Sequence, residues 1–571
     1  MIDCVLELDD SRRLTGPNLF GANAGAIIDV KIKNIDSDQV INIWQQKIHL
    51  LLEKINWKNE SIAFRKYEGG ASLVITAPID CLYAATEVNE AAWQLTVNEL
   101  KNVAELDIEA ITAALLNEIR EEENPPLQAI YEAARKHNVV FLSDDDKVSL
   151  GYGASCQIYP VHQIPKEKDI VWDKIKDIPV ALVTGTNGKS TTVRLASSVV
   201  KAAGKRCGIT STDYIRVGDK ILDHGDYSGP GGARTLLRNL ETEFAFLEVA
   251  RGGMLRRGIG INQARTALIT NVSEDHLGEY GINDLSDMVE AKFIVRQCIN
   301  NDQNLILNAD DNGCVDFAKR LTNNIVWFSW SKDNSVIQNH IRSHGCACYV
   351  KDESIYYYSN DSEQFIISVK DIPITFGGAA KHNVHNALAV VAMSFSLGLT
   401  LNDIVSGLIN FSSTPVDNPG RGNLFEIKGF KVILDFAHNE HGLGLMAETV
   451  NNMPANRKLI MLGQAGDRSD DLIEGLVKSA LKANPDMLII CELESYLRGR
   501  ELGEVPDLIH SLALKHGLDE GQIMRTNNSV EGTEIALNWA RSGDLLLLLG
   551  LDRRDDMIAK LNAATASISN L

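Results

Sequence analysis

Short apolar runs alternate with longer stretches of helical spacing through the middle of the chain. Four of these runs are VALVT (180–184), FAFLEVA (244–250), TALITNV (266–272) and NLILNAD (304–310). Apolar runs of this length are typical of strands buried on both faces of a parallel sheet. The alternation of such strands with helices predicts a parallel α/β sheet domain over residues 171–414.

The flanking parts of the chain have patterns of their own. Residues 1–170 mix strand-like and helical stretches and predict an N-terminal α+β domain for acceptor binding or assembly. A charged, proline-punctuated linker is expected at about 160–178. Residues 415–571 predict a Rossmann-like C-terminal α/β domain, whose first strand we expect in KVILDFA (431–437). A β-rich segment from Ile325 to Phe376 is expected to interrupt the central domain.

Composition narrows the class of protein. The 571 residues include 56 Lys plus Arg and 76 Asp plus Glu, which gives a net charge of −20. This balance argues against a nucleic-acid partner, which normally needs a basic face, and mildly favours a cationic substrate. The nine cysteines form no C-x-x-C pair, and the longest apolar run near the end, DLLLLLGL, is too short to cross a membrane. We expect a cytoplasmic protein with no membrane partner, and whether it is a homo-oligomer stays open.

The stretch VTGTNGKST carries the candidate chemistry. It lies between a predicted strand and a helix in which apolar residues recur up to Gly204, so the loop amides and the helix N-terminus would point at an anion. Lys189 can reach terminal phosphates, and the Ser190 hydroxyl can hold Mg²⁺. The usual P-loop pattern wants a glycine where Val183 stands. From spacing alone, the loop is either a broken site or a shorter working form.

Five motifs then follow in a fixed order: GTNGKST, NVSEDHLG, KHNVHNALA, NPGRGN and LDFAHN. In this order they resemble Mur ligases and folylpolyglutamate synthetases, which join a carboxylate to an amine using ATP. The resemblance implies that the shorter G-T-N-G-K loop is a working form. It also implies a three-domain Mur ligase architecture with a central P-loop domain.

Further segments resemble cyanophycin synthetase. DHGDYSGPGGARTLLRN, LEVARGGMLRRGIG and YLRGRELGE resemble its ligase half, which adds arginine to the side-chain carboxylate of an aspartate chain. RRLTGPNLF and SLGYG resemble segments near its start. In that family an ATP-grasp domain separates the two regions, whereas here only the linker does. We therefore expect one kind of amide bond and no backbone extension.

The resemblance implies ATP and Mg²⁺ as cofactors and assigns roles to named residues. Lys189, Glu248, His276 and Lys292 would be catalytic, with Ser190, Glu248, His276 and a carbamylated Lys292 at the metal. From the residues alone, Glu248 could instead be a loop solubiliser, His276 a surface histidine and Lys292 a solvated helical lysine. The nucleotide contacts would be Gly185, Thr186, Asn187, Gly188, Lys189, Ser190, Thr191, Asn271, Asn383, Asn386, Arg421, Asp435 and His438.

The expected substrate residues rest more heavily on the resemblance. Thr212 and Asp213 match where such ligases hold the acceptor, and Arg251 and Arg256 could bind its carboxylates. The remaining expected contacts, for the incoming amine, are Arg498, Arg500 and Glu501, with Glu501 and Glu504 as a possible fork for a guanidinium. The substrates would be a basic amino acid and an acidic acceptor. The alternatives are a ligase for a cell-wall or folate-like substrate, and a degenerate nucleotide-binding regulator.

Overall fold

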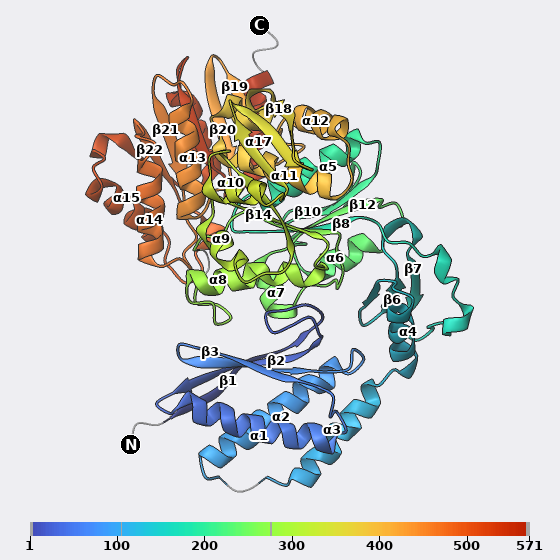
Figure 1. Ribbon diagram of the computed structural model, residues 1–571. Helices are drawn as coiled ribbons and strands as arrows, with labels where there is room; N and C mark the ends of the chain where they lie inside the picture. The colour runs from blue at the N-terminus through green and yellow to red at the C-terminus, as the bar shows by residue number, and fades with distance from the viewer. Residues whose placement is uncertain (1–3, 104–105, 275–276, 567–571) are drawn as a thin grey trace.

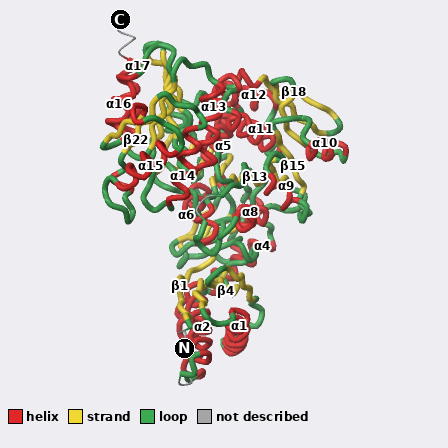
Figure 2. The backbone as a smooth tube through the Cα atoms, turned by 90° about the vertical axis from the view of Figure 1, so that its left-hand side faces the viewer, coloured by secondary structure: helices red, strands yellow, loops and turns green. Residues whose placement is uncertain are grey.

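The computed structural model describes residues 4–103, 106–274 and 277–566, which form three main sheets and one small one (Figure 1). The first sheet is antiparallel with the order β1-β2-β4-β3, and its strands are β1 (Val5–Leu14), β2 (Gly25–Lys33), β3 (Ile62–Tyr67) and β4 (Gly70–Thr76). Its helices are α1 (Ser37–Lys54), α2 (Leu82–Leu100) and α3 (Ile108–Glu122). The sheet lies between these helices and the central domain, which leaves its other face toward the centre (Figures 1 and 2).

A small module connects this N-terminal domain to the centre. It consists of α4 (Pro125–Lys136) and a three-stranded antiparallel sheet of β5 (Phe141–Ser143), β6 (Lys147–Leu150) and β7 (Gln157–Pro160). Residues 161–179 then lead into the central domain without a regular strand or α-helix.

The central sheet has eleven strands in the order β11-β10-β9-β12-β8-β13-β14-β15-β16-β17-β18. The strands are β8 (Val180–Thr184), β9 (Cys207–Thr210), β10 (Tyr214–Val217), β11 (Lys220–His224), β12 (Phe244–Glu248), β13 (Thr266–Ile269), β14 (Asn304–Asn308), β15 (Asn324–Ser329), β16 (Ala347–Lys351), β17 (Ser354–Ser359) and β18 (Ser362–Ser368). It is parallel from β9 to β16 and antiparallel at both ends. The β-rich segment that we expected to interrupt the domain extends this sheet, because β15 pairs with β14.

Helices cover both faces of the central sheet. They are α5 (Lys189–Ala202), α6 (Pro230–Leu237), α7 (Arg251–Arg257), α8 (Leu285–Lys292), α9 (Asn312–Ala318), α10 (Ser335–Arg342), α11 (Lys381–Ser396) and α12 (Leu401–Asn410). Successive residues of β8 enter different cores, since Val180 and Leu182 pack on one face while Ala181 and Val183 pack on the other. This burial on both faces explains the continuous apolar runs in the sequence.

The C-terminal domain is a second sheet covered on both faces, with the order β19-β20-β24-β21-β22-β23. Its strands are β19 (Asn423–Ile427), β20 (Phe430–Asp435), β21 (Lys458–Leu462), β22 (Met487–Cys491), β23 (Ile523–Thr526) and β24 (Leu545–Leu549). Its helices are α13 (Glu440–Asn452), α14 (Asp470–Leu481), α15 (Glu504–Lys515), α16 (Ser529–Trp539) and α17 (Arg554–Ala566). Its first strand is β19 and not the KVILDFA strand that we predicted. β19 and β20 form an antiparallel hairpin, which the single apolar run did not reveal.

The architecture agrees with the expected fold of three α/β units around a P-loop sheet. None of the helices in the described part of the chain combines the length and the hydropathy that crossing a bilayer requires.

Candidate active site

The loop between β8 and α5 has the geometry of an anion site. Gly185 and Gly188 have φ angles of +144° and +87°, in the region that favours glycine. A Cβ on Gly185 would lie 1.9 Å from the Thr270 hydroxyl oxygen, so the loop passes too closely for any side chain. Gly188 caps α5, whose first amides therefore face the loop. Val183 lies in β8 before the turn, so a glycine there is not needed for this bend.

Strand β13 ends in two residues that hold the loop in shape. The Asn271 carbonyl accepts the Thr186 amide at 2.9 Å, and its side-chain oxygen accepts the Asn187 amide at 3.0 Å. The Asn271 side-chain amide and the Thr270 hydroxyl both donate to the Asn187 carbonyl, at 3.0 and 2.6 Å. Both ends of the Asn271 amide are thus used on the loop backbone. We had expected this residue to orient nucleotide or metal-bound water, and in the structure it braces the loop.

Two lysines converge on one carbonyl of this loop. Lys189 Nζ donates to the carbonyls of Gly185 and Thr186 at 2.9 Å each. Lys292, the last residue of α8, is 4% exposed and donates to the same Gly185 carbonyl at 3.0 Å. Both amines therefore lie where phosphate oxygens would be held. The carbamylation that we expected for Lys292 stays a prediction.

Glu248 presents an unusual carboxylate. It ends β12, which pairs with the P-loop strand β8, and it is 2% exposed. Neither of its carboxylate oxygens has a hydrogen-bond partner among the described residues. A buried carboxylate without a partner is costly, and a bound cation would satisfy it.

The donor set fits Mg²⁺, which prefers oxygen ligands and keeps several waters. The Ser190 hydroxyl, at the start of α5, lies 3.5 Å from the Thr212 hydroxyl and offers a further oxygen beside the loop. Within the described ranges, no three His, Cys, Asp or Glu side chains group as a metal cage. His276, our other expected ligand, lies outside the described residues.

A cavity of about 240 Å³ lies between the central and C-terminal domains beside the P-loop. The predicted nucleotide contacts on its walls are Asn187, Gly188, Thr191, Asn271, Asn383, Asn386, Arg421, Asp435 and His438. Asn383 donates to the Ile374 carbonyl at 2.8 Å, and Asn386 donates to the Asn383 side chain at 3.1 Å. Asn383 therefore has a structural role beside its predicted nucleotide contact.

A second linker, residues 411–422 between α12 and β19, supplies another part of the wall of this cavity together with β20. The Arg421 guanidinium lies 4.5 Å from the centre of the Phe436 ring. Burial lowers the pKa of Arg421, and the charges of Asp213 and Asp435 oppose that shift. The Asp435 carboxylate accepts the amides of Gly422 and Ala437 at 2.8 Å each, while burial raises its pKa. A carboxylate with both oxygens on backbone amides anchors the linker to β20.

Sequence reasoning missed several residues of this cavity, among them Asn308, Asp310, Asp311, His382, His385 and His441. Asn308 ends β14 and the two aspartates follow it, so their place at the carboxyl end of a parallel strand was a usable signal. Burial lowers the pKa of His382 to about 4, so its ring is neutral at pH 7. His441, at the start of α13, lies 2.8 Å from the Asn187 side-chain amide and links the C-terminal domain to the P-loop.

A second cavity, of about 650 Å³, opens on the other side of the P-loop. Its basic residues are Lys189, Arg251, Arg256, Arg257 and Lys292, and its acidic residues are Asp226 and Glu279. Thr212 lies on its wall, as the acceptor prediction requires, and Arg251 pairs with Glu279. We call this space the acceptor cavity.

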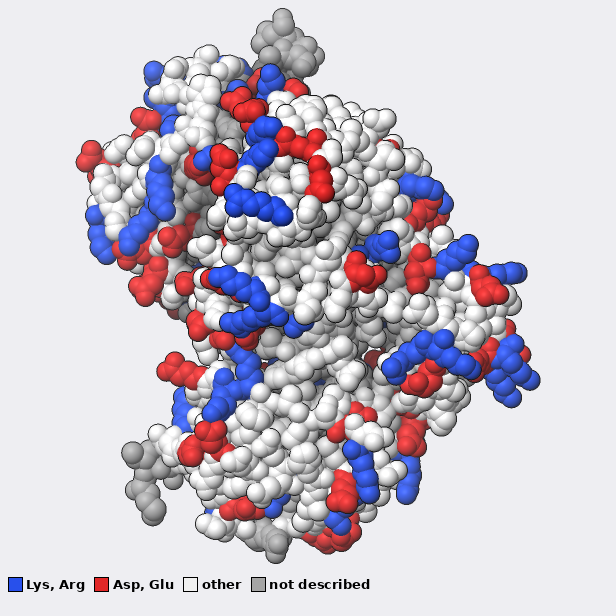
Figure 3. All heavy atoms as spheres, viewed as in Figure 1, with Lys and Arg blue, Asp and Glu red and all other residues white. Residues whose placement is uncertain are grey.

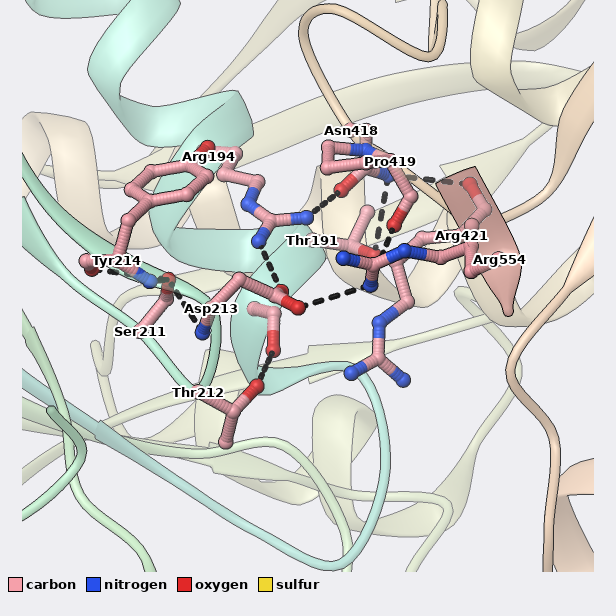
Figure 4. A network of polar contacts seen from close by, with 12 residues as sticks. Thr191, Arg194, Ser211, Thr212, Asp213, Tyr214, Asn418, Pro419, Arg421 and Arg554 are labelled. Carbon is pink, nitrogen blue, oxygen red and sulfur yellow. Dashed lines mark hydrogen bonds and ion pairs between the residues drawn. The ribbon is translucent and has the colours of Figure 1, made fainter. Parts of the chain in front are cut away.

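Asp213 has a different environment from Thr212. Its carboxylate forms ion pairs with Arg194 and, at 2.8 Å, with Arg554 of α17 (Figure 4). Arg194 is fully buried and also donates to Asn418 of the linker at 2.8 Å. Burial opposes ionisation of Asp213, but the charges of Arg194, Arg421 and Arg554 hold its pKa at about 2. Asp213 does not line the acceptor cavity, and it joins α5, the linker and α17.

The YLRGRELGE segment lies away from both cavities. Arg498 pairs with Asp467 at 2.7 Å, and Arg500 pairs with Asp470 at 2.7 Å and with Glu504 at 3.2 Å. Glu501 donates its backbone amide to Glu504 at 3.0 Å. None of the predicted amine-binding residues lines either cavity, and Glu504 already holds a guanidinium of the chain itself. The fork that we expected for an incoming guanidinium is therefore occupied in this arrangement.

Comparison with known proteins shows which families and proteins this chain is similar to. Residues 183–394 match the Mur ligase middle domain, and residues 420–551 match the Mur ligase, glutamate ligase domain. A cyanophycin synthetase from Geminocystis herdmanii is 37% identical over 58% of this chain and 38% of its own length. The UDP-N-acetylmuramoyl-L-alanyl-D-glutamate–2,6-diaminopimelate ligase of Listeria monocytogenes is 24% identical over 65% of this chain and 73% of its own. The chain spans about two fifths of the length of the cyanophycin synthetases that it matches.

Among solved structures, E. coli FolC in complex with ADP aligns with a TM-score of 0.49 and 18% identity, over 68% of this chain and 90% of its own. The two matched models cover the P-loop sheet and the sheet that follows it, in the order that the sequence motifs imply. Through its central and C-terminal domains, the chain belongs to the Mur ligase family.

Proposed function

We propose that the protein is an ATP-dependent ligase that activates a carboxylate as an acyl phosphate, couples it to an amine and releases ADP and phosphate. The observation that carries this proposal is the meeting of two cavities at the P-loop, with His438 on the wall of both. The smaller cavity suits a nucleotide, and the larger one begins at Lys189 and Lys292. A terminal phosphate at the loop would face a second substrate directly, which phosphoryl transfer requires.

The residues in place suit the chemistry of activation. A carboxylate resists attack by an amine, and phosphorylation supplies a leaving group. Lys189, Lys292 and the first amides of α5 can neutralise phosphate oxygens, and Arg421 can add a guanidinium from the linker side. Mg²⁺ held by Glu248 and Ser190 would supply further charge neutralisation. The C-terminal domain would exclude water, which matters because an acyl phosphate hydrolyses.

The acceptor cavity favours an acidic acceptor. Its five lysines and arginines face two acids, so a substrate with several carboxylates would find complementary charge. The relatives named cyanophycin synthetase support an aspartyl peptide as acceptor and a basic amino acid, arginine or lysine, as the amine. On the face shown in Figure 3, basic and acidic side chains of the described residues are interspersed, which supports small substrates over nucleic acid.

Two rival functions make different predictions. A ligase for a cell-wall or folate-like substrate would use the same P-loop but would reject aspartyl peptides. A nucleotide-binding regulator would bind ATP without turnover. The Glu248 carboxylate has no hydrogen-bond partner among the described residues, which disfavours the regulator, since a protein without metal chemistry gains nothing from burying a carboxylate in this way.

The test is a product analysis. The protein is incubated with ATP, Mg²⁺, arginine and a short aspartate peptide, and the products are weighed while ADP is measured. Masses that rise by arginine residues alone, with one ADP per addition, support the proposal. Lysine, diaminopimelate and glutamate in place of arginine test the rival amines. Alternating additions of aspartate and arginine would refute the single-bond expectation, and no product with any basic amino acid would refute the substrate class.

A further inference from the structure

The acceptor cavity has one wall in α7, and the N-terminal domain is hydrogen-bonded to the end of that helix. Thr15 donates its backbone amide and its hydroxyl to the Arg257 carbonyl, at 2.8 and 3.1 Å. The Ile259 amide donates to the Pro17 carbonyl at 2.7 Å. A Cβ on Gly258 would lie 2.7 Å from the Gly16 carbonyl oxygen, so the two backbones are in close contact. The helix that carries the cavity's arginines is therefore docked at its end.

Another part of the cavity wall is a tight turn, and the same domain contacts it too. Glu279 and Ile282 form an isolated antiparallel bridge, and Glu279 and Tyr280 line the cavity. Arg65 of β3 donates to the Gly281 carbonyl at 2.7 Å and pairs with Asp287 in the first turn of α8. We call residues 279–282 the Gly281 turn.

Two aromatic side chains, Tyr280 and Tyr67, make further contacts between the turn and the N-terminal sheet. The Arg12 guanidinium lies 5.1 Å from the centre of the Tyr280 ring, and Asp29 of its own sheet holds it at 2.7 Å. Gly281 has a φ of +68°, and a Cβ there would lie 2.5 Å from a ring carbon of Tyr67. Only glycine allows this approach. The ion pair with Asp29 thus orients the Arg12 guanidinium independently of its contact with Tyr280.

The inner side of the Gly281 turn reaches the chemistry by two routes. Glu279 pairs with Arg251, which fixes one of the arginines inside the cavity. Helix α8 begins beside the Arg65–Asp287 pair and ends at Lys292, which contacts the P-loop carbonyl of Gly185. An eight-residue helix is about 12 Å long and moves as a rigid body, so a displacement of Asp287 at its start also displaces Lys292 at its end.

We propose that the N-terminal domain sets the shape of the acceptor cavity, with Arg65 as the positioning residue that acts through the Gly281 turn and Asp287. The Arg65 and Asp287 side chains are 16% and 23% exposed, so their contact is partly shielded from water. Both contact sets of the domain fall on walls of the same cavity. A domain that served only as an attachment would have no reason to hold both. Use of the cavity by an acceptor rests on the proposed function.

The test compares two neighbouring residues of β3 in the full-length protein. Arg65→Gln removes the hydrogen bond to the Gly281 carbonyl and the ion pair with Asp287. Lys66→Gln is the matched control, because Lys66 pairs at 2.8 Å with the exposed Asp38 of its own domain. Hydrogen–deuterium exchange is followed in peptides from 251–260 and 279–292, with peptides from β20 as internal reference. We expect exchange in 279–292 to rise about tenfold in Arg65→Gln only, whereas 251–260, which Thr15 and Pro17 hold, should change less.

Kinetics then separates positioning from mere attachment. In Arg65→Gln the KM for the aspartate peptide should rise about tenfold. The KM for ATP should stay within about twofold of the wild-type value, and the unfolding temperature within about 2 °C. Unchanged exchange in residues 279–292 would overturn the proposal, as would equal increases in both KM values. If the wild-type protein uses no aspartate peptide, the proposed function fails, and the exchange experiment still decides whether this domain holds the turn.

Discussion

Replacing Arg554 by methionine should loosen the C-terminal domain from the central domain. Its guanidinium contacts Asp213 across the two domains at 2.8 Å, and both side chains are largely shielded, at 23% and 13% exposure. The Asp213 pKa falls from 3.8 to about 2, in spite of burial, through Arg194, Arg421 and Arg554. At about 1.4 kcal/mol per pKa unit, the net shift corresponds to roughly 2 kcal/mol. For the single contact with Arg554 we take about 1 kcal/mol, the upper end for a partly exposed ion pair, which is a factor of about five in the equilibrium between docked and separated domains.

The measurement is the equilibrium affinity for a non-hydrolysable ATP analogue, because both domains form the wall of the smaller cavity. We expect the Kd of Arg554→Met to rise about fivefold. Arg553→Met is the control, since Arg553, just before α17, pairs among the described residues only with Asp556 in the first turn of that helix. Equal affinities for the two variants would refute the reasoning.

The same pair has a defined pH dependence. Because the folded-state pKa of Asp213 is depressed, its contribution is fully present above the unfolded value of 3.8 and is lost as pH falls through about 2. The ratio of the Kd of Arg554→Met to that of wild type for the ATP analogue should therefore be constant from about pH 5 to pH 8 and shrink below about pH 4. A difference that grows on acidification would contradict the assignment.

Three further predictions concern the chemistry. Lys189→Met should lower ATP turnover roughly 10²–10³-fold with little change in unfolding temperature, whereas Lys201→Met, an exposed lysine of the same helix, should leave the rate unchanged. Glu248→Gln should raise the Mg²⁺ concentration for half-maximal turnover at least about tenfold. The stability of the protein should rise or stay constant, because the carboxylate that is replaced has no hydrogen-bond partner within the described ranges, and a loss of stability would speak against this. Lys292→Ala should lose most activity, and partial rescue by small carboxylates would indicate carbamylation, whereas full activity would show an ordinary helical lysine.

Local patterns predicted the strands and the loop because each of those features depends on neighbours in sequence. β8 and β12 are buried on both faces, so their sequences are continuous apolar runs. Gly188 is predictable because one left-handed backbone position in the loop requires glycine. β1 was not predicted, since its LDDSRR stretch is mostly charged and shows no regular alternation of apolar and polar positions. The hairpin partner β19 was missed because it is short and follows the glycine-rich linker.

Long-range contacts explain most of what the sequence could not show in the site. Asp213 and Arg554 are 341 residues apart, and no local spacing indicates that they pair. Thr212 and Asp213 were both expected at the acceptor from the resemblance, yet only Thr212 lines the acceptor cavity, because the Asp213 side chain pairs with Arg194 and Arg554. The contact of Arg65 with Asp287 likewise joins two domains and follows only from their docking.

The link between Asn187 and His441 has a kinetic consequence. At about 240 Å³ the cavity is smaller than the roughly 300–1,000 Å³ of ordinary small-molecule sites, and its walls belong to two domains. We therefore expect the two domains to part when a nucleotide enters and when its product leaves. Each turnover then includes one such separation, and its rate is an upper limit on kcat. Solvent viscosity, which slows domain movement and not bond making, should slow this protein once the bond-forming step is fast.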